Sequence, residues 1–501
     1  MGVTAPAALS TRIAEVVAID PDAPAIEFEG RWRTWAELRI TIDAVAALVD
    51  RPGASVGVIL RNRPEHVGGL LGVLQAGGCV VAINPLRGVE RTREDIERLG
   101  LGCIIGNTAD LEVLVTSASD ATVVAVDELG RPPVVLRGAD GSAATIDADG
   151  VAVLMLTSGT TGPPKRVPLT YATLERVLLD AKYYERGRPP EARLRSGVAI
   201  VNSPLVHLGG LFRVLQCIND GRSFVLLERF TVERWHDAVR RHRPRTVSLV
   251  PAALRMVLEA DLDPADLASI KSVVSGTAPL SPDDADAFFE KYGVPVLVTY
   301  AATEFGGSVA GWNLADHEQF WATKRGSVGR THAGSELRVV DETDGRVLPT
   351  GDEGLLEVKA AALAGEGGWI RTTDLARLDA DGFLWIVGRA DQAIIRGGFK
   401  VRPDDVRLAL ESHPAVRGAS VIGIEHARLG AVPVAAVELR PDAGDVREPE
   451  ILAFLAARLA PYEVPTEIRI VSELPRTESG KVDLGAVRAR FAATTTTGSG
   501  A

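Results

Sequence analysis

Apolar and polar residues follow two different patterns along the chain. In the first half, segments with apolar residues at helical spacing, TWAELRITIDAVAALV (34–49) and RPEHVGGLLGVLQAG (63–77), alternate with the short apolar runs SVGVIL and CVVAINP. Further runs of this kind follow as GVAIVNSP, SFVLLERF, TVSLVP, SVVSG and VLVTYA. Such alternation predicts βαβ units built around a largely parallel sheet.

The pattern changes after about Gly326. SELRVVDE, GLLEVKA and GFLWIVGR are separated by turn signals such as Asp381-Gly382, which predicts an antiparallel, barrel-like part. From Ala390 we expect a compact α+β unit: a short strand, helix RPDDVRLALESH, strands ASVIGIE and VPVAAVEL, helix PEILAFLAARL and strand TEIRIV.

The predicted fold is therefore α/β. A large N-terminal domain of βαβ subdomains with a small β-barrel-like part is followed by a small, mobile α+β C-terminal domain. The predicted boundaries are 1–388 for the large domain, 389–392 for a hinge, 393–490 for the small domain and 491–501 for a disordered tail.

Composition narrows the classes of function. The chain of 501 residues is 46% apolar and 24% charged, with a net charge of −11 and no basic run, which argues against nucleic acid or an anionic membrane as partner. Cys79, Cys103 and Cys217 lie far apart and read as buried thiols of a reducing compartment. The apolar stretch 67–83 holds five glycines and a glutamine, so we expect a buried helix and strand rather than a membrane span. The first residues lack the features of a signal peptide, and we expect a cytoplasmic protein.

A glycine-rich segment carries the first chemical signal. In LMLTSGTTGPPKRVPLT (154–170) an apolar run stops, hydroxyl residues alternate with glycines, and Lys165 follows two prolines. Glycines let backbone N–H groups approach phosphate oxygens, hydroxyls donate further hydrogen bonds, and the lysine adds positive charge. It is not a Walker A loop, since Lys165 is followed by Arg166 rather than Ser or Thr.

The string LTSGTTGPPK resembles the phosphate-loop signature of the adenylate-forming superfamily, which comprises acyl- and aryl-CoA synthetases, peptide-synthetase adenylation domains and beetle luciferases. YAATE (300–304), TTDLARLDADGFLWIVGRADQAIIRGGFKV (372–401) and PRTESGKVD (475–483) resemble its other motifs, in the same order. The chain is closest in type to acyl- and aryl-CoA ligases. The resemblance implies that a carboxylate and ATP form acyl-AMP and pyrophosphate, with Mg²⁺, and that the acyl group then passes to the thiol of CoA.

The resemblance assigns roles to residues of the large domain. Tyr300 would stack on adenine, Thr303 would hydrogen-bond the α-phosphate, and Glu304 would hold Mg²⁺. Ala301 stands where the family usually has glycine, and its added methyl group leaves less space at that position. Phosphate and nucleotide contacts are further expected from Thr157, Ser158, Gly159, Thr160, Thr161, Gly162, Lys165, Gly276, Thr277 and Ala278.

Other roles fall near and beyond the predicted hinge. Asp374 would accept both ribose hydroxyls, and Arg389 would contact the ribose. Thr373 replaces a usual glycine, so either the backbone is ordinary there or the loop is locally altered. Asp391 matches the hinge position, with a solvated turn acid as the alternative. The residue that stabilises the adenylation transition state would be Lys481, and the CoA or thiol loop would contain Gly397, Gly398 and Lys400.

The acyl pocket is expected to contain His207, Gly276, Ala301, Gly306 and Gly307. His207 could equally be a satisfied core residue. No acid follows it, which disfavours an α-amino acid, and the glycine pair suggests room for an aryl or bulky apolar acid. Mg²⁺ brought by ATP is the only metal expected.

These motifs predict an ATP-dependent acid–CoA ligase. Two alternatives are an acyl-AMP ligase that loads the pantetheine of an acyl carrier protein, and a catalytically idle relative that only binds nucleotide or acyl ligand. The sequence carries no signal for the identity of the acid or for an oligomeric state.

Overall fold

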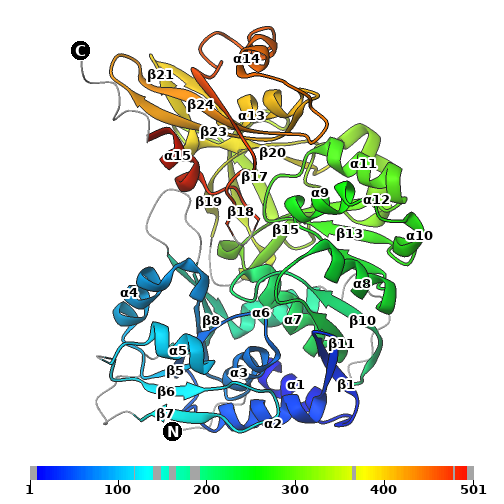
Figure 1. Cartoon of the computed structure of the whole chain (residues 1–501), viewed down its shortest axis with the longest axis vertical. Helices are drawn as coiled ribbons and strands as arrows, with labels where there is room; N and C mark the ends of the chain where they lie inside the picture. Colours follow the sequence, from blue (N-terminus) through cyan, green and yellow to red (C-terminus); the bar gives the residue numbers. More distant parts are fainter. Residues whose placement is uncertain are drawn as a thin grey trace. The chain divides into compact units, whose positions relative to one another are not determined.

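A computed structural model (Figure 1) describes residues 8–117, 119–138, 148–156, 165–180, 192–363, 368–477 and 480–492. The chain divides into two compact units. Unit 1 is Met1–Val309 with Ala360–Gly365, and unit 2 is Ala310–Lys359 with Glu366–Ala501. The functional border predicted at residue 388 lies within unit 2 and stays a prediction.

The first sheet of unit 1 has seven strands in the order β7-β6-β5-β3-β4-β8-β9. The five inner strands are parallel, and only β7 and β9 at the edges are antiparallel to their neighbours. The strands are β3 (Ser55–Ile59), β4 (Cys79–Ile83), β5 (Cys103–Gly106), β6 (Thr122–Ala125), β7 (Val134–Arg137), β8 (Val151–Leu156) and β9 (Arg166–Thr170).

A second sheet has the order β10-β11-β1-β2, with β1 (Pro24–Phe28), β2 (Arg31–Thr34), β10 (Arg195–Val201) and β11 (Arg222–Leu226). A third contains the parallel strands β12 (Thr246–Ser248), β13 (Ser272–Ser275) and β14 (Val296–Ala302). It continues with β15 (Gly307–Gly311), and the chain passes into unit 2 within this strand.

Helices cover both faces of the first sheet, because its buried strands alternate their side chains between two cores. Val56 and Val58 join one core with α1, α2, α3 and α7, whereas Ile59 joins a second core with α4 and α5. The helices of unit 1 are α1 (Ala8–Val17), α2 (Trp35–Ala46), α3 (Pro64–Gln75), α4 (Val89–Leu99), α5 (Thr108–Leu114), α6 (Tyr171–Asp180), α7 (Leu208–Asn219), α8 (Val232–His242), α9 (Pro251–Glu259), α10 (Pro264–Leu267) and α11 (Pro282–Tyr292), with the short turns η1 (Pro85–Arg87), η3 (Thr303–Phe305) and η4 (Ala361–Leu363).

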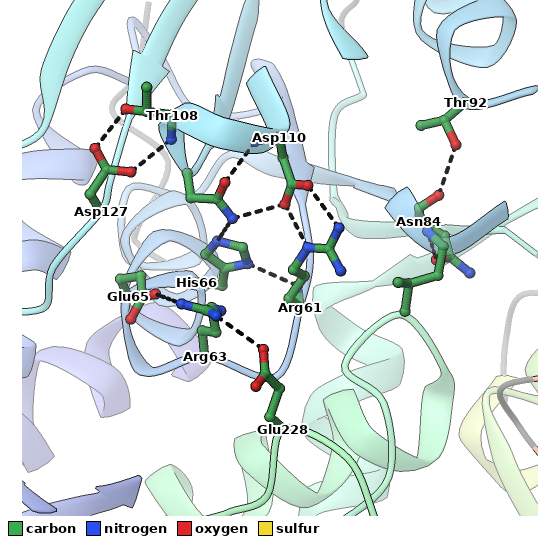
Figure 2. A network of polar contacts seen from close by, with 12 residues as sticks. Arg61, Arg63, Glu65, His66, Asn84, Thr92, Thr108, Asp110, Asp127 and Glu228 are labelled. Atoms are coloured by element: carbon green, nitrogen blue, oxygen red, sulfur yellow. Dashed lines mark hydrogen bonds and ion pairs between the residues drawn. The ribbon is translucent and has the colours of Figure 1, made fainter. Parts of the chain in front are cut away.

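Polar residues that follow the carboxyl ends of strands form a linked group in unit 1, which we term the carboxyl-edge network (Figure 2). Arg61 donates two hydrogen bonds to Asp110, at 2.6 and 2.7 Å. The backbone N–H of Arg61 donates to His66 Nδ1 at 2.8 Å. The members are Arg61, Arg63, Glu65, His66, Asn107, Thr108, Asp110, Asp127 and Glu228. Arg61 pairs with Asp110, Arg63 pairs with Glu65 and Glu228, and Asp127 accepts two hydrogen bonds from Thr108, so the network stabilises this edge of the sheet.

Unit 2 is antiparallel in its first part. β16 (Arg330–Thr331) pairs with the last residues of β15, and a four-stranded sheet contains β17 (Glu336–Val340), β18 (Glu353–Lys359), β19 (Ile370–Leu378) and β20 (Leu384–Arg389). The last sheet has the order β22-β21-β24-β23 with β25 parallel to β24. Its strands are β21 (Ile394–Arg396), β22 (Phe399–Val401), β23 (Val416–His426), β24 (Gly430–Leu439) and β25 (Glu467–Val471).

Three helices pack on this last sheet. α13 (Pro403–Glu411) and α14 (Glu448–Ala456) share one core with it, and α15 (Leu484–Ala492) shares another through Val487 and Phe491. The helix α15 was not expected from the sequence, where Leu484, Val487 and Phe491 are its only large apolar residues. Unit 2 also contains α12 (Leu314–Lys324) and η5 (Ala390–Gln392). Across the described residues, no helix is both long and apolar enough to cross a membrane.

Candidate active site

The loops after β13 and β14 lie close together. These strands are parallel neighbours, so their carboxyl ends share one edge of the sheet, where open α/β folds bind ligands. A Cβ atom at Gly276 would lie 3.0 Å from Thr299 Cγ2 and 3.3 Å from the carbonyl oxygen of Thr299. The missing side chain of Gly276 therefore lets the loop Gly276–Thr277–Ala278 pack beside β14, one residue before Tyr300.

Thr277 has a strained backbone in this loop. Its φ is +71°, a conformation that β-branched residues rarely adopt. Its hydroxyl donates a 2.5 Å hydrogen bond to the carbonyl of Gly276. Strain of this kind persists only where surrounding packing maintains it, and it is frequent at ligand sites. No local pattern in the sequence indicates this strain.

The segment Tyr300–Glu304 turns sharply at the end of β14. The half-buried ring of Tyr300 lies 5.9 Å from that of Phe305, at 48°. The turn η3 closes at Gly306, which has φ +71° and donates its N–H to the carbonyl of Thr303. Glu304 is exposed in this turn, so its carboxylate oxygens are accessible to a cation.

A magnesium ion fits such a carboxylate without a protein cage. Within the described part of the chain, no group of three or more His, Cys, Asp or Glu side chains could hold a metal. Mg²⁺ commonly takes one or two protein carboxylates, and the phosphates of its nucleotide and water supply the remaining ligands.

The predicted pocket-floor glycines pack on α6. A Cβ atom at Gly306 would lie 2.6 Å from Thr173 Cγ2, and one at Gly307 would lie 3.3 Å from Val177 Cγ1. Both glycines thus let the backbone approach a helix. The space that the sequence suggested there is occupied by α6 side chains, so these residues open no room for an acid on that side. Their assignment to the acyl pocket remains a prediction.

His207 stands at the start of α7, at the carboxyl end of β10. Its backbone is extended, and its carbonyl accepts N–H groups from Gly210 and Leu211. A Cβ atom at Gly210 would lie 2.2 Å from the carbonyl oxygen of Pro204, so the turn requires glycine. Asn202 donates a 3.0 Å hydrogen bond to the carbonyl of Ser248 at the end of β12. This bond ties the His207 segment to the sheet that carries Tyr300.

The glycine-rich segment connects β8 to β9. Leu156 and Arg166 are register partners in this antiparallel pair, and Lys165 is exposed just before β9. The other predicted phosphate contacts, Thr157, Ser158, Gly159, Thr160, Thr161 and Gly162, lie outside the described residues.

In unit 2, Asp374 and Arg389 face each other across β19 and β20. Arg389 Nη1 lies 3.7 Å from Asp374 Oδ1, and the guanidinium makes two hydrogen bonds to Asp391, at 2.9 and 2.7 Å. The hydrogen bonds from Arg389 lower the pKa of Asp391. The two predicted ribose residues and the predicted hinge acid therefore form one ion-paired group.

Thr373 lies inside strand β19 and has no positive φ. Of the two possibilities that the sequence left open, the backbone is ordinary at this position. A glycine is therefore not required for the path of the chain beside Asp374.

Gly397 and Gly398 form the turn between β21 and β22, with φ of +57° and +89°. No atom lies within 4 Å of a Cβ placed on Gly398, so the space beside the turn is open within the described residues. Lys400, on β22, pairs with Glu342 at 2.5 Å. The sequence alone did not reveal this partner.

Lys481 lies in a tight turn. Its carbonyl accepts the N–H of Thr477 at 2.7 Å, and Gly480 has φ +78°. Arg476 and Val482 form an isolated antiparallel bridge on either side of it. The backbone around Lys481 is therefore set by local hydrogen bonds.

Comparison with known proteins places these motifs in a family. Residues 13–366 match the model of the AMP-binding enzymes, and residues 408–481 match the AMP-binding enzyme C-terminal domain. A 4-coumarate–CoA ligase of Oryza sativa is 29% identical, over 93% of this chain and 88% of its own. A 2-succinylbenzoate–CoA ligase of Bacillus cereus is 30% identical, over 93% and 95%.

Among solved structures, the o-succinylbenzoate–CoA synthetase of Bacillus subtilis in complex with ATP and magnesium superposes with a TM-score of 0.76 and 26% identity, over 95% of this chain and 99% of its own. The α/β fold with a small C-terminal domain and the family resemblance, both predicted from the sequence, are confirmed. The chain belongs to the family of AMP-binding enzymes.

Proposed function

We propose that the protein is an ATP-dependent carboxylic acid–CoA ligase. In the first half-reaction a carboxylate oxygen attacks the α-phosphorus of ATP. An O–P bond forms, the bond between the α-phosphorus and the β-phosphate breaks, and acyl-AMP and pyrophosphate result. In the second, the thiol sulfur attacks the acyl carbon. A C–S bond forms, the C–O bond to AMP breaks, and the thiol proton passes to solvent.

The enzyme class expected from the sequence is confirmed by the family match and by the ligase relatives. It is an AMP-forming acid–thiol ligase, a class that uses ATP, Mg²⁺ and CoA. The finer assignments to residues and to a substrate are proposals.

The packing of the loop 276–278 beside β14 carries the proposal. It sets Gly276, which precedes the strained Thr277, against Thr299, which precedes Tyr300, at the carboxyl edge of a parallel sheet. Such an edge suits a nucleotide, because loop backbone and side chains converge there from strands that are distant in sequence.

Each residue then has a physical role. The ring of Tyr300 offers an apolar face for adenine, and Thr303 offers a donor to the α-phosphate. Glu304 would hold Mg²⁺, which when bound would neutralise phosphate charge between two anionic reactants. Asp374 would accept ribose hydroxyls, with its position supported by Arg389.

Unit 2 would contribute one residue set to each half-reaction. We assign Lys481 to adenylation, where an oriented cation stabilises the charge-rich transition state. The open turn at Gly397 and Gly398 is assigned to passage of the thiol arm. Residues 389–392 would absorb the backbone change between the two steps, with the Arg389–Asp391 pair at their start.

The proposed substrate is an aryl or bulky apolar acid. Leu208 and Gly209 follow His207, so no carboxylate is present there to hold the ammonium of an amino acid. The relatives are named for 4-coumarate and 2-succinylbenzoate, two acids that contain an aromatic ring.

A panel of aryl, alicyclic, short aliphatic and amino acids, assayed for pyrophosphate release with MgATP, tests the proposal. We expect aryl acids to exceed acetate and every amino acid, and CoA to convert the product to a thioester. Release of ADP and orthophosphate only, or no reaction with any acid, would contradict adenylation. Thioester formation with a carrier-protein pantetheine but not with CoA would replace the proposed acceptor.

A further inference from the structure

Arg166, the first residue of β9, is cationic and yet largely shielded from solvent. Its side chain is 14% exposed, and that of its partner Asp95 on α4 is 4% exposed. Arg166 lies at the closing end of the glycine-rich connection and directly follows Lys165.

The guanidinium reaches across three strands. Its Nη2 donates to Asp95 Oδ2 at 2.6 Å, and its Nη1 donates to the carbonyl of Ala82 in β4 at 2.8 Å and to that of Leu154 in β8 at 3.5 Å. One side chain thus links the edge strand β9, its neighbour β8, the next strand β4 and helix α4. The other oxygen of Asp95 pairs with Arg98 at 2.7 Å.

Such a pair contributes little net stability, because both ions lose most of their hydration and this cost offsets their attraction. The planar, forked guanidinium of Arg166 is suited to holding the backbone that carries it in one position. The position fixed here is specific. Arg166 is the register partner of Leu156, so these two residues set both ends of the connection 157–165. β9 is an edge strand with a single neighbour, and the Arg166 side chain supplies a second attachment.

We propose that Arg166 is a positioning residue for the phosphate side of the ATP site, and that it acts by fixing the backbone of Lys165. The composition of the connection, glycines and hydroxyls ending in a lysine, is that of an anion-binding loop. A shift of its closing end would move the ammonium group of Lys165. The proposal rests on the proposed ATP-dependent function.

The test uses the full-length protein with two variants and one matched control. Arg166→Lys keeps the charge but removes the fork, and Asp95→Asn keeps the shape of the partner but removes its charge. Arg98→Gln is the control, because Arg98 pairs with the same carboxylate but its side chain is 64% exposed. The measurements are KM for MgATP, KM for the acid, kcat of pyrophosphate release, thioester formation from preformed acyl-AMP, and MgATP binding by calorimetry.

We expect Arg166→Lys and Asp95→Asn to raise the KM and the dissociation constant for MgATP about tenfold or more, because a small misplacement of a binding group has effects of this order. The KM for the acid and the second half-reaction should stay within about twofold of the wild-type values, and Arg98→Gln should match wild type.

Unchanged MgATP binding in both variants, or an equal loss in both half-reactions, would overturn the proposal. Failure of both variants to fold would also overturn it, since the pair would then be a general requirement of unit 1. Wild-type protein that binds MgATP but releases no pyrophosphate with any acid would contradict the proposed ligase function instead, and the calorimetry would still decide the role of Arg166.

Discussion

The candidate site residues of the two units are held in different ways. In unit 1 they follow strands of parallel sheets, and residues distant in sequence pack against them, as Thr299 does for Gly276 and Thr173 for Gly306. In unit 2 they lie on antiparallel strand pairs and tight turns, where Asp374 faces Arg389 and the carbonyl of Lys481 bonds Thr477. Site substitutions in unit 1 should therefore change folding stability, whereas those in unit 2 should change chemistry with little effect on stability.

Lys481→Ala is the strongest test of this comparison. Only the side chain is lost, and the turn is held by backbone hydrogen bonds, so thermal unfolding should match wild type. Loss of one oriented charge should slow acyl-AMP formation about 10²–10³-fold, about 3–4 kcal/mol. Transfer from preformed acyl-AMP to CoA should be largely spared. Single-turnover assays of each half-reaction measure both effects.

The matched control is Lys359→Ala, since Lys359 is an exposed lysine of the same unit that pairs with Glu336. It should leave both half-reactions unchanged. Equal loss of both half-reactions in Lys481→Ala, with an unchanged unfolding curve, would mean that one fixed arrangement performs all the chemistry.

His66 should give unit 1 a pH-dependent stability. Burial lowers the pKa of His66 to about 4 from an ordinary value of 6.5, and the charges that face it are Asp110, Arg63, Arg61 and Asp127. Between pH 6.5 and 4, His66 therefore binds a proton in the unfolded chain but not in the folded unit. Stability is full above pH 6.5, falls as the pH drops toward 4, and levels off below that. At 1.36 kcal/mol per pKa unit, the loss is about 3 kcal/mol.

Hydrogen exchange of the α3 amides, measured between pH 7 and pH 4.5, reports this loss. In His66→Asn the amide oxygen can accept the N–H of Arg61 in place of Nδ1, but nothing titrates. The variant should lose much less stability than wild type over the same pH range. Parallel pH dependences in the two proteins would show that His66 is not the group responsible.

The same difference between the units explains what could be predicted from the sequence. TWAELRITIDAVAALV predicted α2 (Trp35–Ala46), because apolar residues at helical spacing are a local signal. The structure adds a capping box between Thr34 and Glu37 at its start. The motifs that contain Lys481 and Gly397–Gly398 are likewise short local strings, and the roles assigned to these residues remain predictions. The strain at Thr277, the burial of Arg166 and the packing of Gly306 on α6 depend on residues far away in the chain, and no local pattern encodes such contacts.

Two adjacent glycines of α7 differ in how closely the rest of unit 1 packs against them. A Cβ atom at Gly210 would meet backbone, 2.2 Å from the carbonyl oxygen of Pro204, whereas nothing lies within 4 Å of one at Gly209. Gly210→Ala should lower the free energy of unfolding by about 1–3 kcal/mol and also lower activity, because the turn carries His207. Gly209→Ala should be neutral or stabilising by up to about 1 kcal/mol, since alanine favours the helix. Thermal unfolding of the two variants measures the difference. Equal midpoints would mean that the turn relaxes to accommodate the Cβ atom at residue 210 at little cost in stability.

The smallest effect is expected at Thr373 in unit 2. The family resemblance led us to expect glycine beside Asp374, yet the backbone of Thr373 is that of an ordinary strand. Thr373→Gly should therefore relieve no strain. It should cost about 0.5–1 kcal/mol of stability, because glycine loses more backbone entropy in a strand. It also removes the Thr373 side-chain hydrogen bond that helps to lower the pKa of Asp391. The KM for MgATP should stay within about threefold of wild type, since Arg389 still makes both of its bonds to Asp391. A tenfold gain in adenylation rate would instead show that the threonine distorts the ribose site, and the view that unit 2 sites are locally determined would then fail at this position.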